Sequence, residues 1–187
     1  MNEGNIFKLL KKSGAIMEGH FLLTSGRHSG RFLQCSQLLQ YPDHAAQICG
    51  RMAEPFQNKG VEIVIGPAMG GVILAYETAR SLGARALFAE RSGGEMILRR
   101  GFSIKPGEKV LVVEDAVTTG GSVQKVLDLL QFLRAEVIGV SILVDRTAGS
   151  LDFGLPSKSL LTMEIESYEA GNCPLCLEGI PLQRPKG

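Results

Sequence analysis

The sequence lacks the features that mark several specialised classes of protein. Its 187 residues include only four cysteines, too few for a disulfide scaffold and typical of a reducing, cytoplasmic compartment. No apolar run approaches the roughly 18 residues of a membrane span, and the charged N-terminal stretch lacks the apolar centre of a signal peptide. The formal net charge of +1 provides no overall basic field for nucleic acid. We therefore expect a cytoplasmic globular protein of one domain, with no membrane or nucleic-acid partner.

What is present is an alternation of apolar strands with amphipathic helices. Apolar runs predict strands at 61–66, 85–90, 109–115 and 136–145. Two of the helices between them each have one apolar face, at spacings i, i+3, i+4 and i+7. These faces consist of Val72, Ala75, Tyr76 and Ala79, and of Val123, Val126, Leu127 and Leu130. The pattern predicts an α/β fold with an open, mainly parallel sheet flanked by helices.

The two ends of the chain are expected to form a smaller lobe. Residues 3–13 predict a helix, 19–36 a hairpin, and 160–167 a strand that could join the N-terminal segment. A further helix should begin at Asp43, a good N-cap, and run to about Asn58. We therefore expect one domain over 1–187, with a core at about 43–150 and a hood formed by about 1–42 and 151–187.

Three loops at the carboxyl ends of strands carry residues suited to ligand binding, the position where open α/β sheets hold their ligands. The loops "GPAMGG" (66–71) and "TTGGS" (118–122) each lead glycine-rich backbone into a helix N-terminus, which favours an anion. Two such loops indicate two phosphate-bearing groups on one ligand. The third loop, "LVDRTAG" (143–149), contains Asp145 and Arg146. The plainer alternatives are an ordinary strand–helix turn for the first loop and a surface Asp145–Arg146 salt bridge for the third.

Two adjacent acids, Glu114 and Asp115, end the strand in "VLVVEDAVTTGGSV" (110–123). Carboxylates repel phosphates, so these acids need sugar hydroxyls, or a divalent cation that itself bridges phosphates. A solvated turn is the alternative, and the preceding apolar strand argues against it. The sequence has no G-x-x-x-x-G-K-[ST] and no G-x-G-x-x-G, which argues against a P-loop nucleotide triphosphatase and a dinucleotide-binding fold.

The stretch "VLVVEDAVTTGGS" resembles the signature of the phosphoribosyltransferase family: an apolar run, two acids, two variable residues and T-[TA]-G-[GT]-[ST]. Three other segments resemble the branch of this family that uses orotate. They are "TSGRHSGRFLQ" (24–34), "VDRTAG" (144–149) and the ending "CPLCLEGIPL" (173–182). The resemblance implies the type I phosphoribosyltransferase fold, orotate and phosphoribosyl pyrophosphate as substrates, Mg²⁺ as cofactor, and a homodimer whose mobile loop closes over the neighbouring subunit's site.

The same resemblance implies roles for individual residues. Arg91 and Asp115 are the expected catalytic residues, and Mg²⁺ is expected to be held mainly through the substrate's oxygens, without a direct protein site. The residues expected to contact phosphoribosyl pyrophosphate are Arg91, Glu114, Asp115, Ala116, Val117, Thr118, Thr119, Gly120, Gly121, Ser122, Ala68, Met69, Gly70 and Gly71. Those expected to contact orotate are Thr118, Arg146 and Phe32, with Arg146 paired to the carboxylate.

The sequence departs from the family pattern where lysines are frequent. Gly70 and Thr24 occupy two such positions, and the expected mobile loop, "AERSGGEMILRRG" (89–101), offers only arginines. We choose Arg91 as its catalytic cation. Arg99 and Arg100 are equally consistent with surface charges, and a solvated hairpin is the alternative for the loop as a whole.

Cys173 and Cys176 form a single C-x-x-C. Zinc usually needs four ligands, so its partners would have to be Cys35, Cys49 or a distant histidine. The three histidines have no metal-binding spacing among themselves, and we expect packed or exposed histidines with no metal.

Two other functions compete with orotate transfer. A regulator that binds nucleic acid would need a basic face or an added domain, and the sequence offers neither. A purine phosphoribosyltransferase has no substrate carboxylate, so Arg146 and the S-G-R-x-S segment would have no role. Orotate is therefore the preferred base.

Overall fold

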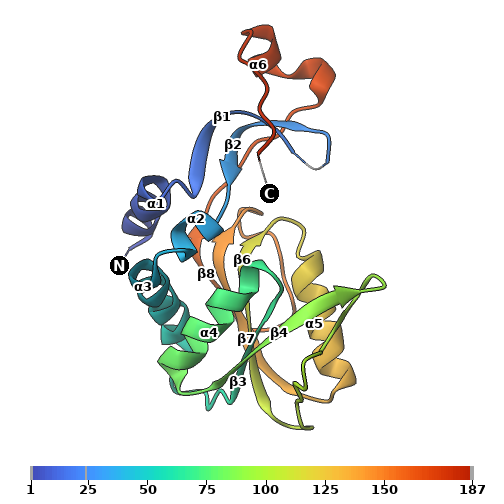
Figure 1. Ribbon diagram of the computed structural model, residues 1–187. Coiled ribbons are helices and arrows are strands. Elements are labelled where there is room, and N and C mark those ends of the chain that lie inside the picture. The colour runs from blue at the N-terminus through green and yellow to red at the C-terminus, as the bar shows by residue number, and fades with distance from the viewer. Residues whose placement is uncertain (1, 24, 186–187) are drawn as a thin grey trace.

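A computed structural model describes residues 2–23 and 25–185; Thr24 therefore lies outside the described residues. Its centre is a six-stranded sheet with the order β5-β4-β3-β6-β7-β8 (Figure 1). The strands are β3 (Ile63–Pro67), β4 (Arg85–Ser92), β5 (Glu95–Ile97), β6 (Lys109–Val117), β7 (Glu136–Asp145) and β8 (Ser157–Thr162). All neighbours pair in parallel except β5, which is antiparallel to β4. The predicted open, mainly parallel sheet is confirmed.

Helices cover both faces of this sheet (Figure 1). One face packs against α3 (Pro42–Ala53) and α4 (Gly70–Leu82), and the other against α5 (Gly121–Phe132). Along β6, Leu111 and Val113 belong to the first apolar cluster, whereas Val110 and Val112 belong to the second. A strand covered on both faces must be apolar at every position, which explains the continuous run "VLVV".

The apolar face predicted for α5 is confirmed, because Val123, Val126, Leu127 and Leu130 are all buried. The face predicted for α4 is partly wrong: Tyr76 is 64% exposed. The buried stripe of α4 instead includes Leu74 and Thr78 beside Ala75 and Ala79. Periodicity gives the spacing of an apolar stripe, but the neighbouring elements decide which of two overlapping stripes faces the core.

The start and end of α3 also differ from the prediction. The helix begins at Pro42 rather than using Asp43 as its N-cap, and its α-helical part ends at Ala53. Proline is well suited to the first helical position, because its fixed φ matches the helix and it has no N–H to satisfy. At the other end, Pro55 lies in a 3₁₀ turn, η1 (Glu54–Phe56), which tightens the chain before β3.

A second, two-stranded sheet forms the hood at one end of the molecule (Figure 1). It consists of β1 (Ile16–Leu22) paired antiparallel with β2 (His28–Leu33), so the predicted hairpin is confirmed. The C-terminal segment adds η2 (Ala170–Asn172) and α6 (Pro174–Leu177) to this lobe. His28 and Tyr168 exchange two backbone hydrogen bonds of 2.8 Å, which attaches the tail to β2.

The predicted boundary of the hood is corrected at both ends of the chain. The strand expected at 160–167 in the small lobe is β8, which pairs with β7 and extends the main sheet. At the N-terminal end, α1 (Glu3–Lys12) and α2 (Ser36–Leu39) place Ile6, Leu10, Leu38 and Leu39 in the main apolar cluster. Apolar burial explains why β8 joins the main sheet, because Leu161 and Met163 pack into the main apolar cluster instead of the hood. Within the described ranges, no helix is long and apolar enough to cross a membrane.

Candidate active site

The loop between β6 and α5 forms a cradle for an anion. Thr118 and Thr119 are exposed at its rim, and Gly120 is the N-cap of α5 with φ +76°, a backbone conformation that favours glycine. A Cβ at Gly120 would also lie only 3.1 Å from Leu151 and Phe153 side-chain atoms. The hollow lined by Ala116 to Val123 together with Glu114 has a volume of ≈ 50 Å³. The first N–H groups of a twelve-residue helix open onto it, which suits a phosphate.

Glu114 and Asp115 lie at the end of β6, directly before this cradle. Glu114 is buried, and burial together with the neighbouring Asp115 carboxylate raises the pKa of Glu114 to about 9. Burial also raises the pKa of Asp115, although its carboxylate accepts a 2.7 Å hydrogen bond from the Ala116 N–H. Two neighbouring buried carboxyl groups do not both ionise fully unless a cation or hydrogen-bond donors compensate their charge. They are therefore suited to accept hydrogen bonds from hydroxyl groups or to share a cation.

The loop from β3 into α4 lies against the same acids. A Cβ at Gly70 would be 2.5 Å from Asp115 Oδ2, so only glycine fits without moving the carboxylate. The backbones of Gly66 and Gly71 also touch, since a Cβ on either would meet the other at 2.8 Å or less. Ala68 and Met69 form the tip of the loop, and the side chain of Met69 is exposed. The lysine that is frequent in the family at Gly70 therefore has no room in this arrangement.

Arg146 follows β7 at the same edge of the sheet. Its backbone N–H donates to the Val117 carbonyl at 2.9 Å, which places it beside the start of the cradle. Its Nε is one of three buried side-chain polar atoms that lack a hydrogen-bond partner among the described residues. Partial burial lowers the pKa of this guanidinium. A half-buried cation with an unsatisfied donor suits an anionic ligand.

The Asp145–Arg146 salt bridge considered from the sequence does not form. The Asp145 carboxylate instead accepts hydrogen bonds from Thr147 N–H at 2.7 Å, Thr147 Oγ1 at 2.6 Å and Gly149 N–H at 3.1 Å. Asp145 therefore shapes the turn after β7 and leaves the Arg146 guanidinium available to a ligand.

The segment expected as a mobile loop is an antiparallel hairpin of β4 and β5, which turns at Gly93 and Gly94 (Figure 1). Arg100 is committed to the structure, because it pairs with Glu90 at 2.7 Å and lies 5.8 Å from the centre of the Phe88 ring. Arg99 donates to Ser92 Oγ at 3.2 Å. Arg91 is exposed on β4, opposite Met96, and forms no ion pair within the described chain. Of the three arginines, only Arg100 is paired with a carboxylate within the described residues, so the charge of Arg91 is available to a ligand.

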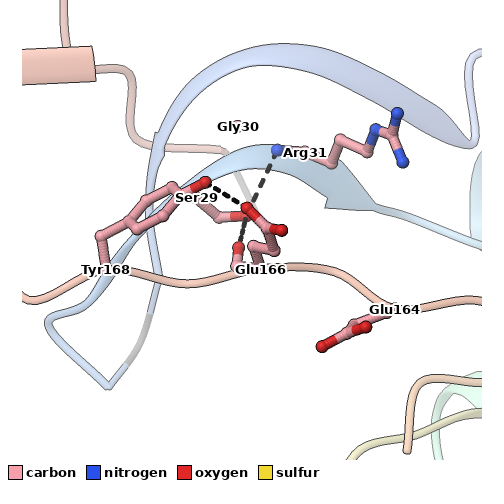
Figure 2. A pocket seen from close by; sticks show the side chains of 6 residues that line it. All are labelled: Ser29, Gly30, Arg31, Glu164, Glu166 and Tyr168. Atoms are coloured by element: carbon pink, nitrogen blue, oxygen red, sulfur yellow. Dashed lines mark hydrogen bonds between the residues drawn. The ribbon is translucent and has the colours of Figure 1, made fainter. Parts of the chain in front are cut away.

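Phe32 lies in the hood, on β2, with its ring centre 5.8 Å from that of Phe21. Figure 2 shows a separate pocket of ≈ 310 Å³ in this lobe, between β2 and the segment that contains Glu164 and Glu166. Ser29 Oγ closes one side by donating to the Glu166 carbonyl at 2.7 Å. Arg31 lines this pocket beside the two glutamates, and none of the residues predicted to contact phosphoribosyl pyrophosphate or orotate does.

Cys35 is a neighbour of the site that the sequence did not indicate as part of it. Its buried thiol lies 3.8 Å from the Asp115 carbonyl oxygen, and burial, followed by the charges of Asp115 and Glu114, raises its pKa. An inert, uncharged thiol at this position fills the space beneath the acids without adding charge. Its position at the start of α2 depends on how the hood joins the core, which no local motif indicates.

Comparisons with known proteins match most of the chain. The model of the phosphoribosyl transferase domain matches residues 34–166. Curated orotate phosphoribosyltransferases of Desulforamulus reducens and Caldicellulosiruptor bescii are 52% and 51% identical over 185 residues, which is 99% of this chain and 97% of theirs. The crystal structure of orotate phosphoribosyltransferase from Aeropyrum pernix superposes with a TM-score of 0.72 at 28% identity, covering 83% of this chain and 92% of that one.

Proposed function

The chain belongs to the orotate phosphoribosyltransferases of the phosphoribosyltransferase family, and on that premise we propose the reaction that its site performs. The ribose 5-phosphate group passes from 5-phosphoribosyl 1-pyrophosphate to orotate, which gives orotidine 5′-monophosphate and pyrophosphate in pyrimidine biosynthesis. The observation that carries this proposal is Arg146, a half-buried guanidinium with an unsatisfied Nε beside the anion cradle. A base with its own carboxylate satisfies that donor, whereas a purine does not.

The phosphoribosyl group is held by the end of β6 and the start of α5. The cradle of Thr118 to Ser122 receives the 5-phosphate through N–H groups and hydroxyls. Glu114 and Asp115 accept hydrogen bonds from the ribose hydroxyls. The negative charge that the pair keeps also favours the positive character that the ribose ring gains as the bond to pyrophosphate breaks.

The leaving pyrophosphate is met by the loop of Ala68 to Gly71 and by Arg91. As negative charge grows on pyrophosphate, the N–H groups of this loop and the Arg91 guanidinium stabilise it. A single oriented donor of this kind contributes roughly 3–4 kcal/mol to the transition state. Closure of the β4–β5 hairpin keeps water from the activated sugar.

Mg²⁺ is the cofactor of the proposed reaction. The two carboxyl groups at the end of β6 are oxygen donors of the type that Mg²⁺ shares with substrate phosphates, so the residues present fit this ion. When bound through the substrate, it neutralises charge on pyrophosphate. Orotate already carries charge, and the proposal needs no strong general base.

The proposal includes a cytoplasmic homodimer in which the hairpin of one subunit reaches the site of the other. Supporting it, Met69, Ile73 and Tyr76 lie along one side of α4 and its N-cap as exposed large apolar side chains. Such a stripe next to a site is typical of a surface that a partner covers.

The test is a comparison of bases. The purified protein is incubated with phosphoribosyl pyrophosphate and either orotate, adenine or hypoxanthine, with Mg²⁺ or with excess EDTA. We expect consumption of orotate alone, and only with Mg²⁺. Turnover of a purine, or no turnover by a folded protein that binds phosphoribosyl pyrophosphate, would contradict the proposal.

A further inference from the structure

Four metal-ligating side chains meet in the hood, away from the site described above. They are His20 on β1, His28 on β2, Cys173 at the N-cap of α6 and Cys176 within α6. One ligand atom from each lies within 4.8 Å of all the others. His20, His28 and Cys173 are buried, whereas Cys176 is exposed. Figure 1 shows α6 beyond the β1–β2 sheet, at the end of the molecule farthest from α3, α4 and α5.

The separations between these atoms fit one tetrahedral ion. Zn–S bonds of about 2.3 Å and Zn–N bonds of about 2.0 Å put neighbouring ligand atoms about 3.3–3.8 Å apart. His20 Nε2 is 3.5 Å from Cys173 Sγ and 3.8 Å from Cys176 Sγ. Cys176 Sγ is 3.3 Å from His28 Nδ1. The two ring nitrogens, His20 Nε2 and His28 Nδ1, are 2.9 Å apart and would separate by a few tenths of an ångström to admit an ion.

The orientation of His20 also matches that of a metal ligand. Its Nδ1 lies 2.7 Å from the carbonyl oxygen of Ile180. A carbonyl oxygen can only accept a hydrogen bond, so Nδ1 carries the proton and Nε2 presents its lone pair to the cluster. A backbone carbonyl that fixes the outer ring nitrogen in this way is typical of histidines that bind metals.

The C-terminal tail adds little apolar core to the hood. Leu177 is 87% exposed, and Ile180 and Leu182 are also exposed, so the tail contributes little apolar burial. Backbone bonds between Gln183 and β1, of 2.7 Å to His20 and 2.9 Å to Leu22, attach the tail to the hairpin. A lobe with so small a core is usually stabilised by disulfides or a structural metal.

We propose that His20, His28, Cys173 and Cys176 bind one Zn²⁺ ion that fastens the C-terminal segment to the β1–β2 hairpin. Two thiolates and two imidazoles are a preferred ligand set for this ion, and four protein ligands leave no open position for catalysis. The ion is therefore structural. It holds the hairpin that carries Phe32 against the C-terminal segment.

The first test measures metal content, which does not depend on activity toward any base. The full-length protein, produced with zinc in the medium, is analysed for metal by mass spectrometry beside Cys176→Ser, Cys173→Ser and His44→Ala. We expect about one zinc per chain in the wild type and in His44→Ala, because His44 lies on α3 outside the cluster. Both cysteine variants should lose at least nine-tenths of the zinc, and Cys176 is the milder change because it is exposed.

A second test covers the case in which the cysteine variants fail to fold. The wild type is stripped with a chelator, and its thermal unfolding is followed as ZnCl₂ or MgCl₂ is returned. Zn²⁺ at a few equivalents should raise the melting temperature by several degrees, and Mg²⁺ should not. Cobalt should give visible sulfur-to-metal absorption bands. The proposal would be overturned if the wild type contained no metal, or contained a Cys173–Cys176 disulfide, and its melting temperature did not respond to Zn²⁺.

Discussion

At the scale of single residues, the buried Glu114 carboxyl group makes folding stability depend on pH. Burial and the Asp115 charge raise its pKa from 4.5 to about 9, so the folded protein favours the protonated form. This contribution to stability is complete below pH 4.5, where the unfolded chain is protonated as well. It is lost as pH rises from 4.5 toward about 9, because the unfolded chain ionises freely while the folded one does not.

We therefore expect Glu114→Gln to stabilise the ligand-free protein progressively as pH rises. The gain in unfolding free energy should be about 1–3 kcal/mol at pH 8.5 and much smaller at pH 5, measured by urea unfolding at both values. The matched control is Glu136→Gln, an exposed glutamate at the start of β7. An effect of Glu114→Gln that is equal at the two pH values would contradict this account of the acid pair.

At the scale of elements, the β3–α4 turn is built around the absence of a side chain at Gly70. Alanine normally favours a helix start more than glycine does, but here its Cβ would lie 2.5 Å from Asp115 Oδ2. We expect Gly70→Ala to displace the Asp115 carboxylate and to lower kcat/KM for phosphoribosyl pyrophosphate by about ten- to a hundredfold. Steady-state kinetics at saturating orotate, with phosphoribosyl pyrophosphate varied, measure this kcat/KM.

The control for Gly70→Ala is Gly50→Ala, inside α3, where a Cβ would meet nothing within 4 Å. That variant should keep wild-type kinetics and gain about 0.5–1 kcal/mol of stability. Wild-type kinetics in Gly70→Ala would show that Asp115 has room to move without consequence.

The elements also show what could be predicted from the sequence. Strands β3, β4, β6 and β7 and the buried face of α5 follow from apolar runs and periodicity, and the β6–α5 loop follows from its motif. Tyr76 and β8 could not be placed in this way, because the choice between two apolar stripes, or between two sheets, depends on the partner element. The cluster of His20 with Cys173 was missed for the same reason: the two residues meet only through the pairing of β1 with the tail, and no spacing along the chain records it.

At the scale of the whole molecule, the proposed homodimer divides each site between two subunits. Arg91 and Arg146 would then come from different chains. We expect Arg91→Ala and Arg146→Ala each to be nearly inactive alone, and their equimolar mixture to recover about a quarter of wild-type activity after subunit exchange. Half of the dimers are mixed, and each mixed dimer has one intact site. No recovery, with exchange verified by native mass spectrometry, would mean that Arg91 serves its own subunit.

The assignment of orotate as the base depends on one proposed contact, between the Arg146 guanidinium and the carboxylate of orotate. The most direct measurement is kcat/KM for orotate in Arg146→Ala, beside the affinity of the same variant for phosphoribosyl pyrophosphate. The control is Arg51→Ala, an arginine that pairs with Glu54 on the surface of α3 and η1. We predict that kcat/KM falls about a hundredfold or more in Arg146→Ala, while binding of phosphoribosyl pyrophosphate and the control stay near wild type. A kcat/KM for orotate within a factor of about three of the wild type would contradict the assignment of Arg146, and with it the argument from this site to orotate.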